Sequence, residues 1–204
     1  MRDSLLTGCT ALVDAAALDD DDAFTSALSA TYERVAAARR TERDAAMRFL
    51  GEHIERCDPR RASWVAVLAA GLASLGTDPM PVVAPILACL KTVAEAAAYF
   101  AGAWRDATDE PCPEPQDAVD PRVHRLLEPA LGDATSVVLE AWACLPRWTA
   151  AALATLAASA TARRADRDTP LLVRVVTAGA EHYPALHQVR ALLAEPRGPE
   201  PVGC

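Results

Sequence analysis

Residues 79–107 read PMPVVAPILACLKTVAEAAAYFAGAWRDA, the longest stretch with helical apolar spacing in the chain. Apolar side chains recur there at steps of three and four, which keeps one face of an α-helix apolar: Val83, Ile86, Leu87, Leu90, Val93, Ala97, Phe100 and Trp104. The pattern predicts one helix of roughly seven turns. Pro85 could introduce a kink, because proline lacks the N–H that an interior helical position donates.

The same spacing continues on both sides of this helix, and no run of alternating β-branched and polar residues competes with it. We expect helices over 3–17, 22–39, 41–57, 59–75, 79–107, 121–131, 133–145, 147–164, 169–181 and 184–194. The sequence therefore predicts an all-α protein, a multi-helix bundle or irregular helical domain of about 8–10 helices.

Several expected helices begin with an acidic residue followed by proline. An aspartate side chain accepts from the free amides of the first turn, and proline at the first helical position gives up an N–H that has no partner there. The pattern occurs at Asp58-Pro59, Asp78-Pro79, Asp120-Pro121 and Asp168-Thr169-Pro170. Thr41–Asp44 resembles a capping box, and Asp19–Asp22 places negative charge at another helix start.

Three of these starts, at Asp78, Asp120 and Asp168, are 42 and 48 residues apart. This spacing resembles the period of about 40–47 residues in helical-hairpin solenoids of the HEAT type. A short HEAT-like α-solenoid is therefore the alternative architecture. The resemblance covers only the last two thirds of the chain and implies no activity.

One segment interrupts the helical pattern. Residues 108–119 contain Pro111, Pro113 and Pro115 and cannot continue a helix. They form a Pro-rich linker between an N-terminal helical half, 1–107, and a C-terminal half, 120–195, which we expect to form one compact domain. The Pro- and Gly-rich tail at 196–204 is expected to be disordered.

The composition of the chain limits which kinds of molecule it is expected to bind. The chain has 204 residues, 45 of them alanine, and a net charge of −8, which disfavours general binding to nucleic acids or anionic membranes. Arginine outnumbers lysine 19 to 1, as in proteins from GC-rich bacterial genomes. Asp3 stands where a secretory signal would be positively charged, so we expect no such signal. The longest uncharged stretch, residues 62–77, is shorter than the ~20 residues of a spanning helix. We expect a cytoplasmic protein.

Six cysteines occur at positions 9, 57, 89, 112, 144 and 204, without a Cys-x-x-Cys pair. Most are expected to be buried thiols. His53 and Cys57 lie four residues apart on one expected helix, a spacing that suits two metal ligands, although a third would have to come from elsewhere. This pair is the candidate metal site.

The densest polar cluster lies at an expected turn between two helices. Glu181, His182, Tyr183 and His187 surround Pro184 and form the candidate ligand-binding site. The alternative is a surface turn in which a histidine caps a helix end.

Motifs of common enzymes are absent: no Gly-x-Ser-x-Gly, phosphate-binding Gly-Lys loop, dinucleotide fingerprint or His-Glu-x-x-His occurs. No catalytic residue or cofactor is indicated, and enzyme activity stays an open question. We expect a helical protein-protein interaction or adaptor module without catalytic activity, which binds a protein partner or forms a homo-oligomer. The alternative is a small-molecule-binding protein or enzyme whose pocket is enclosed by helices, for example in specialised metabolism.

Overall fold

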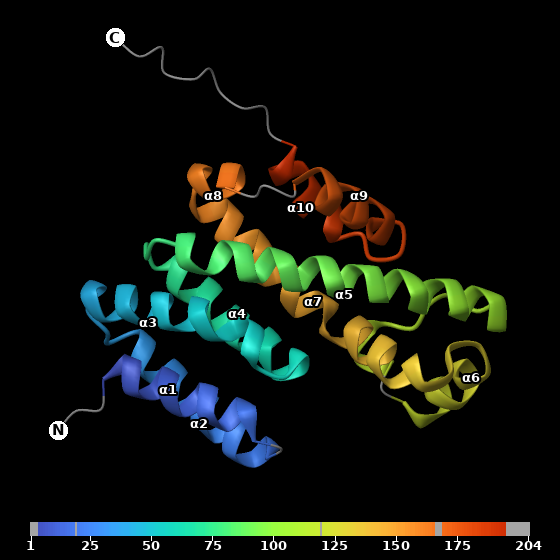
Figure 1. Ribbon diagram of the computed structural model, residues 1–204, viewed down its shortest axis with the longest axis horizontal. Coiled ribbons are helices and arrows are strands. Elements are labelled where there is room, and N and C mark those ends of the chain that lie inside the picture. Colours follow the sequence, from blue (N-terminus) through green and yellow to red (C-terminus); the bar gives the residue numbers. More distant parts are fainter. Residues whose placement is uncertain (1–3, 19, 119, 166–168, 195–204) are drawn as a thin grey trace, which may run out of the picture.

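The computed structural model describes residues 4–18, 20–118, 120–165 and 169–194, which fold into α-helices joined by turns and short 3-10 helices (Figure 1). No strand occurs among these residues, so the predicted all-α class is confirmed. The α-helices are α1 (Leu5–Ala17), α2 (Asp21–Val35), α3 (Arg40–His53), α4 (Pro59–Ser74), α5 (Met80–Ala107), α6 (Pro121–Leu131), α7 (Thr135–Ala158), α8 (Ala160–Ala165), α9 (Thr169–Ala180) and α10 (Leu186–Leu193). The 3-10 helices are η1 (Ile54–Arg56), η2 (Pro115–Asp117) and η3 (Gly132–Ala134). The predicted disordered tail, 196–204, lies outside the described residues.

Most of the acidic residues at helix starts act as caps, as predicted, but at Asp78-Pro79 the N-cap is Pro79 itself; α5 begins at Met80, whose N–H donates to Asp78 Oδ1 at 3.1 Å. Asp58 Oδ1 accepts hydrogen bonds from the backbone N–H groups of the next helical turn, at 3.0 and 3.2 Å, and opens α4. Asp120 Oδ1 accepts from the Arg122 N–H at 2.7 Å and opens α6. Asp20 does the same for α2, where it accepts from the Ala23 N–H at 2.9 Å. The start predicted at Asp168 lies outside the described residues.

The capping box predicted at Thr41–Asp44 lies two residues earlier. Helix α3 begins at Arg40, and the Glu42 carboxylate accepts from the Arg39 backbone N–H at 2.9 Å. This hydrogen bond and the nearby guanidinium lower the pKa of Glu42. A capping box needs a side chain that reaches back across one turn to the N-cap amide, which glutamate does, whereas aspartate is shorter by one CH₂ group.

The break predicted at Pro146, between helices 133–145 and 147–164, is wrong. Helix α7 runs continuously from Thr135 to Ala158 with Pro146 inside it, and the chain breaks instead at Ser159. Ser159 is extended, and its Oγ accepts from the Ala162 N–H at 3.2 Å, which caps α8. An interior proline costs about 3 kcal/mol. Burial of Leu145 and Trp148 on either side of it offsets that cost.

Helix α7 is the hub of the fold. It packs most extensively against α5 and α4, and also contacts α6, α8 and α10. By contrast α4 and α5, which follow each other in the chain, touch at few points. A solenoid stacks neighbouring repeats in chain order. The observed packing around α7 is therefore that of a bundle, and the HEAT-like alternative does not describe it.

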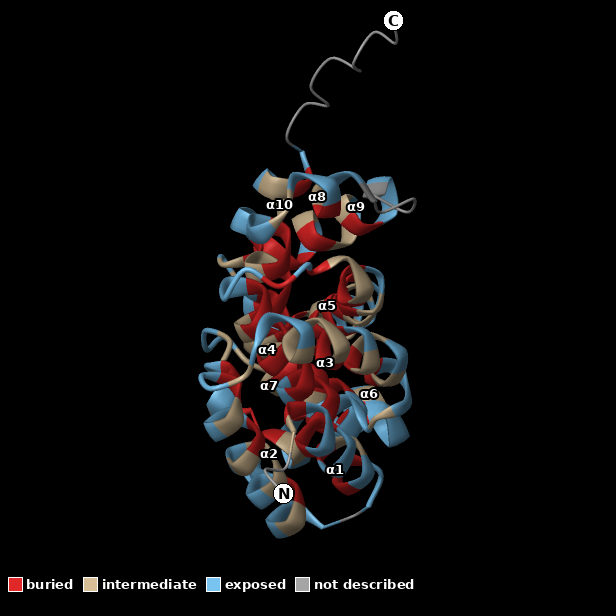
Figure 2. Cartoon of the chain, turned by 90° about the vertical axis from the view of Figure 1, so that its left-hand side faces the viewer, coloured by how far each residue is buried: buried red, intermediate tan, exposed pale blue. Residues whose placement is uncertain are grey.

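The core is rich in alanine, as expected from the composition. Ala66 and Ala69 of α4 and Ala151 and Ala152 of α7 are fully buried, which lets these two helices approach closely. Figure 2 shows the buried residues along the inside of the packed helices and exposed residues on their outer faces. The largest fully buried side chains include Trp142, Trp148 and Phe100. Trp64, by contrast, is 39% exposed. The guanidinium of Arg147 lies over its ring, 4.8 Å from the ring centre.

By length and composition α5 could cross a membrane, and it is the one such helix among the described residues. The core helix of a soluble protein meets the same criteria. In α5 the side chains of Ile86, Leu90 and Phe100 are fully buried, and α3, α7 and α9 pack against the helix. Figure 1 shows α5 running between the N-terminal helices and α9–α10.

Candidate functional site

The cluster predicted around Pro184 divides when the chain folds. Tyr183 is half-buried and packs edge-on against Trp142, with ring centres 6.4 Å apart. Burial raises the pKa of Tyr183, and the nearby Glu114 carboxylate adds to the shift. Glu181 and His187 are exposed, and His182 is half-buried at the turn from α9. Among the described residues no side-chain hydrogen bond or ion pair joins these groups, and a ligand-binding site there stays a prediction.

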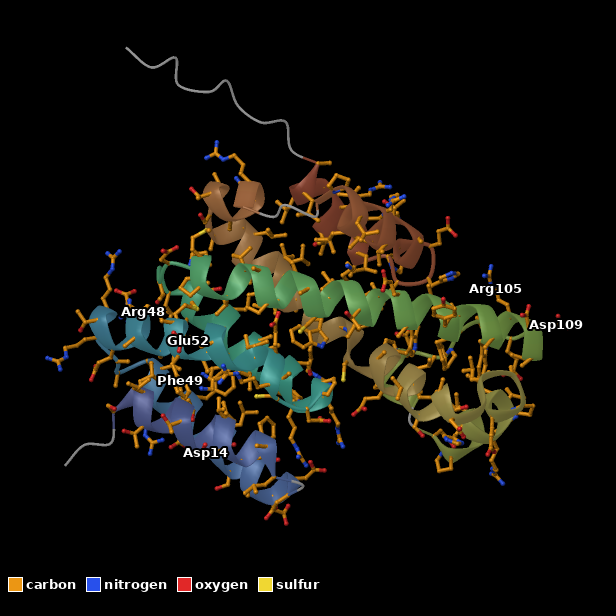
Figure 3. The ribbon with its side chains drawn as sticks, viewed as in Figure 1. Asp14, Arg48, Phe49, Glu52, Arg105 and Asp109 are labelled. Carbon is orange, nitrogen blue, oxygen red and sulfur yellow. The ribbon has the colours of Figure 1, made fainter. Side chains whose placement is uncertain are left out.

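His53 and Cys57 both bond to carbonyls of their own segment. The His53 Nδ1 lies 2.7 Å from the Phe49 carbonyl oxygen, and the two rings stack with centres 4.2 Å apart. Figure 3 labels Phe49 on α3. Cys57 Sγ donates to the His53 carbonyl at 3.4 Å. Across the described chain no group of three or more His, Cys, Asp and Glu side chains is placed to hold a metal ion. The predicted pair therefore has no third ligand there.

A row of aromatic rings connects the end of α5 to α7. Phe100 stacks on Trp104 and on Trp142, with ring centres 6.1 and 4.9 Å apart. Such offset pairs add to the stability gained from burying the rings. The row fixes the positions of two indoles beside the Pro-rich segment.

Both indoles donate hydrogen bonds to that segment. Trp104 Nε1 donates to the carbonyls of Glu110 and Pro111, at 2.8 and 3.1 Å. Trp142 Nε1 donates to the Pro113 carbonyl at 3.0 Å. The carbonyl groups of this segment are free to accept such bonds because its backbone forms no regular hydrogen-bond pattern of its own. The two tryptophans therefore hold the predicted linker against the helical core.

The held segment forms one wall of a groove whose other wall is α6. The groove has a volume of about 730 Å³. We call it the α6 groove; the residues used below are Trp104, Pro111, Pro113, Arg122, Arg125 and Leu126. Its volume lies within the range of roughly 300–1,000 Å³ that is usual for binding sites.

Helix α6 divides its residues between the core and the groove. Val123 and Leu127, four positions apart, are buried, which anchors the helix. Leu126 is 38% exposed, and Arg122 and Arg125 are exposed beside it. Arg122 and Arg125 make no ion pair with any described residue. The wall therefore presents one apolar side chain beside two available positive charges.

The groove lining also contains two acidic residues, Glu110 in the Pro-rich wall and Asp120 at the start of α6, and the Glu110 side chain is exposed. The Asp120 carboxylate is occupied as the cap of α6. Arg105, labelled in Figure 3, projects from the side of α5 that faces away from α6 and does not line the groove. The charges that a ligand would meet along α6 are thus mainly positive.

A second, smaller pocket contains the predicted residue Cys57. It lies between η1, α4, α5 and α7, has a volume of about 260 Å³, and is lined mainly by Cys57, Ala62, Ala88, Cys89, Val93 and Trp148. Burial raises the pKa of both thiols, that of Cys89 to about 11. Both thiols are therefore protonated and uncharged at neutral pH.

The sequence analysis missed most residues of both sites. Arg122, Arg125 and Leu126 follow a recognised helix start, and their i, i+3, i+4 spacing places them on one face. That spacing was the available signal for the groove. Cys89 and Trp148 belong to different helices, and nothing in the local sequence brings them together.

Comparisons with protein-family models, curated proteins and solved structures give no match for this chain.

Proposed function

We propose that the protein is a cytoplasmic binding module without catalytic activity, and that the α6 groove holds an amphipathic helix of another protein. The observation that carries this proposal is the exposed Leu126 beside Arg122 and Arg125, in a groove that Trp104 and the Pro-rich segment also line. Neither nucleic acid nor a membrane is part of the proposal, because the chain has a net charge of −8.

The chemistry of the groove favours a helix over an extended peptide. An extended peptide gains affinity mainly by adding a strand to exposed backbone N–H and C=O groups. Here Pro111 and Pro113 have no N–H to offer, and the Glu110 and Pro111 carbonyls already accept from Trp104. A helix satisfies its own backbone and docks through side chains, which is what an apolar groove with charged rims requires.

The partner helix should carry large apolar residues at helical spacing with carboxylates beside them. The apolar residues would contact Leu126 and Trp104, and the carboxylates would pair with Arg122 and Arg125. Arginine is well suited to this role because its guanidinium binds a carboxylate through two parallel hydrogen bonds.

The test selects ligands without knowing the natural partner. A phage library that displays randomised residues on a helical scaffold is panned against the protein, and affinities are measured by fluorescence anisotropy. Selected helices should combine acidic and large apolar residues. Leu126→Asp should weaken their binding about tenfold or more, since burying a leucine contributes about 1.5–3 kcal/mol.

The chain offers closely matched controls. Leu171 on α9 is 37% exposed, against 38% for Leu126, so Leu171→Asp should leave affinity unchanged. The charge reversal Arg122→Glu/Arg125→Glu should weaken binding, whereas Arg48→Glu/Arg174→Glu changes net charge equally at exposed sites elsewhere. The proposal is wrong if both groove variants still bind the selected helices. It is also wrong if the control variants lose binding together with the groove variants.

A second copy of the chain is the other possible occupant, and light scattering after size exclusion distinguishes it. We expect a species of 21.6 kDa, the mass of one chain. A dimer that Leu126→Asp dissociates and Leu171→Asp does not would show that the groove binds another copy, and would overturn the assignment to a different protein.

A further inference from the structure

The turn between α9 and α10 is connected to the Pro-rich wall of the α6 groove through one buried indole. In this turn the Tyr183 ring packs edge-on against Trp142, with an angle of 77° between the two rings. The Glu114 carboxylate of the Pro-rich segment is close enough to add to the raised pKa of Tyr183. Neither Tyr183 nor Trp142 is among the residues that line the groove. An effect of Tyr183 on the groove therefore passes through the residues that support the wall.

Trp142 has a neighbour on each side of this connection. Phe100 of α5 stacks on the indole with ring centres 4.9 Å apart, and Tyr183 meets it at 6.4 Å. The indole Nε1 donates to the Pro113 carbonyl at 3.0 Å. Phe100 is fully buried in the close-packed core, whereas Tyr183 is half-buried in a turn. Of the two rings that contact Trp142, Tyr183 is thus the one that can move without disturbing the core.

We propose that Tyr183 is a positioning residue of the α6 groove: it orients Trp142, which holds Pro113 in the wall, and the α9–α10 turn thereby regulates the affinity of the groove. Energetic coupling between two places in a protein passes through packed side chains and hydrogen bonds. Here the chain has two links, the ring contact and the Nε1 hydrogen bond. This inference rests on the proposed function, because the regulated property is helix binding in the same groove.

The first test needs no ligand. Hydrogen exchange of the Trp142 Nε1–H, followed by NMR, reports whether the bond to Pro113 is kept. Tyr183→Ala removes the edge contact and should accelerate this exchange about two- to tenfold, whereas Tyr183→Phe keeps an aromatic edge and should restore the wild-type rate. The Nε1–H of Trp148, on the same helix, should exchange at the wild-type rate in both variants, which shows that the core is intact. Wild-type exchange of Trp142 in the Tyr183→Ala protein would overturn the proposal.

Cys112 reports on the wall itself. It stands between Pro111 and Pro113, is half-buried against the core, and has a pKa raised by this burial. Labelling of Cys112 with N-ethylmaleimide at pH 8.5, measured by peptide mass spectrometry, should be about two- to tenfold faster in Tyr183→Ala than in wild type. Labelling of Cys57, which lies outside the groove, should not change. Equal labelling of Cys112 in the two proteins would show that Tyr183 does not hold the wall.

A double-mutant cycle tests the coupling to helix binding. Tyr183→Ala should weaken binding of the helices selected by panning about two- to tenfold. Tyr32 is a 39%-exposed tyrosine of α2, which packs mainly against α1, so Tyr32→Ala should leave the affinity unchanged. In a Trp142→Phe background, which lacks the Nε1 donor, Tyr183→Ala should weaken binding no further. Equal losses in both backgrounds would show that Tyr183 does not act through Trp142, and would overturn the proposal.

The measurements separate this proposal from the proposed function. If panning yields no helix whose binding depends on Leu126, the proposed function is wrong, and the exchange and labelling rates alone decide whether Tyr183 positions the wall. If helices bind the groove but Tyr183→Ala changes neither these rates nor the affinity, the groove stands as a binding site and its control by the α9–α10 turn is wrong.

Discussion

Gly51 on α3 meets the first turn of α5 more closely than any side chain would permit. A Cβ built on Gly51 would lie 2.2 Å from the Pro81 carbonyl oxygen and 2.8 Å from its carbon. These are backbone atoms, so no flexible side chain can move away. Gly71 on α4 is also helical but has nothing within 4 Å of the same position. The two glycines therefore form a matched pair for substitution by alanine.

Gly71→Ala should stabilise the protein by about 0.5–1 kcal/mol, because alanine is the better helix former and loses less backbone entropy. Gly51→Ala gains the same amount but forces α3 and α5 apart by about 0.8 Å to restore a 3.0 Å contact. Overpacking of this kind costs about 1–3 kcal/mol, so the net effect is a loss of up to about 2.5 kcal/mol.

Thermal unfolding followed by circular dichroism measures both effects. In a domain of this size 1 kcal/mol corresponds to about 2–4 °C. Gly71→Ala should therefore raise Tm by about 1–4 °C, and Gly51→Ala should lower it by up to about 10 °C. Equal shifts in the two variants would refute the close contact between α3 and α5.

Three further changes follow from individual contacts. Trp142→Phe leaves the Pro113 carbonyl without its donor, and should lower the free energy of unfolding in urea by about 1–3 kcal/mol. Alkylation of Cys89 should accelerate about tenfold per pH unit from pH 7 to 10, because its pKa is about 11; a plateau below pH 10 would contradict this burial. The hydrogen bond from Arg61 lowers the pKa of Asp21, so Asp21 stabilises the fold above the usual carboxyl pKa and this contribution disappears as the pH falls through the lowered value. The stability difference between wild type and Asp21→Asn should therefore shrink on acidification, as followed by urea unfolding.

The helix starts could be predicted because a cap is a local interaction. Asp58 and Asp120 reach amides only two or three residues away, and the residues that decide the bond are adjacent in the sequence. The buried link between α4 and the start of α2 is different. Arg61 is 8% exposed and donates to the Leu18 carbonyl and to the Asp21 carboxylate, about forty residues away. An Arg-Arg pair at a helix start gives no sign of that partner.

The wrong break at Pro146 and the packing of residues 108–119 against the core have one physical cause. Pro146 was expected to end a helix because its local cost is large, and residues 108–119 were expected to form a linker because they cannot be helical. In the fold, burial of Leu145 and Trp148 carries α7 through the proline, and the indoles of Trp104 and Trp142 hold the Pro-rich segment on the core. Local rules state the cost of each conformation correctly. They omit the tertiary contacts that offset it.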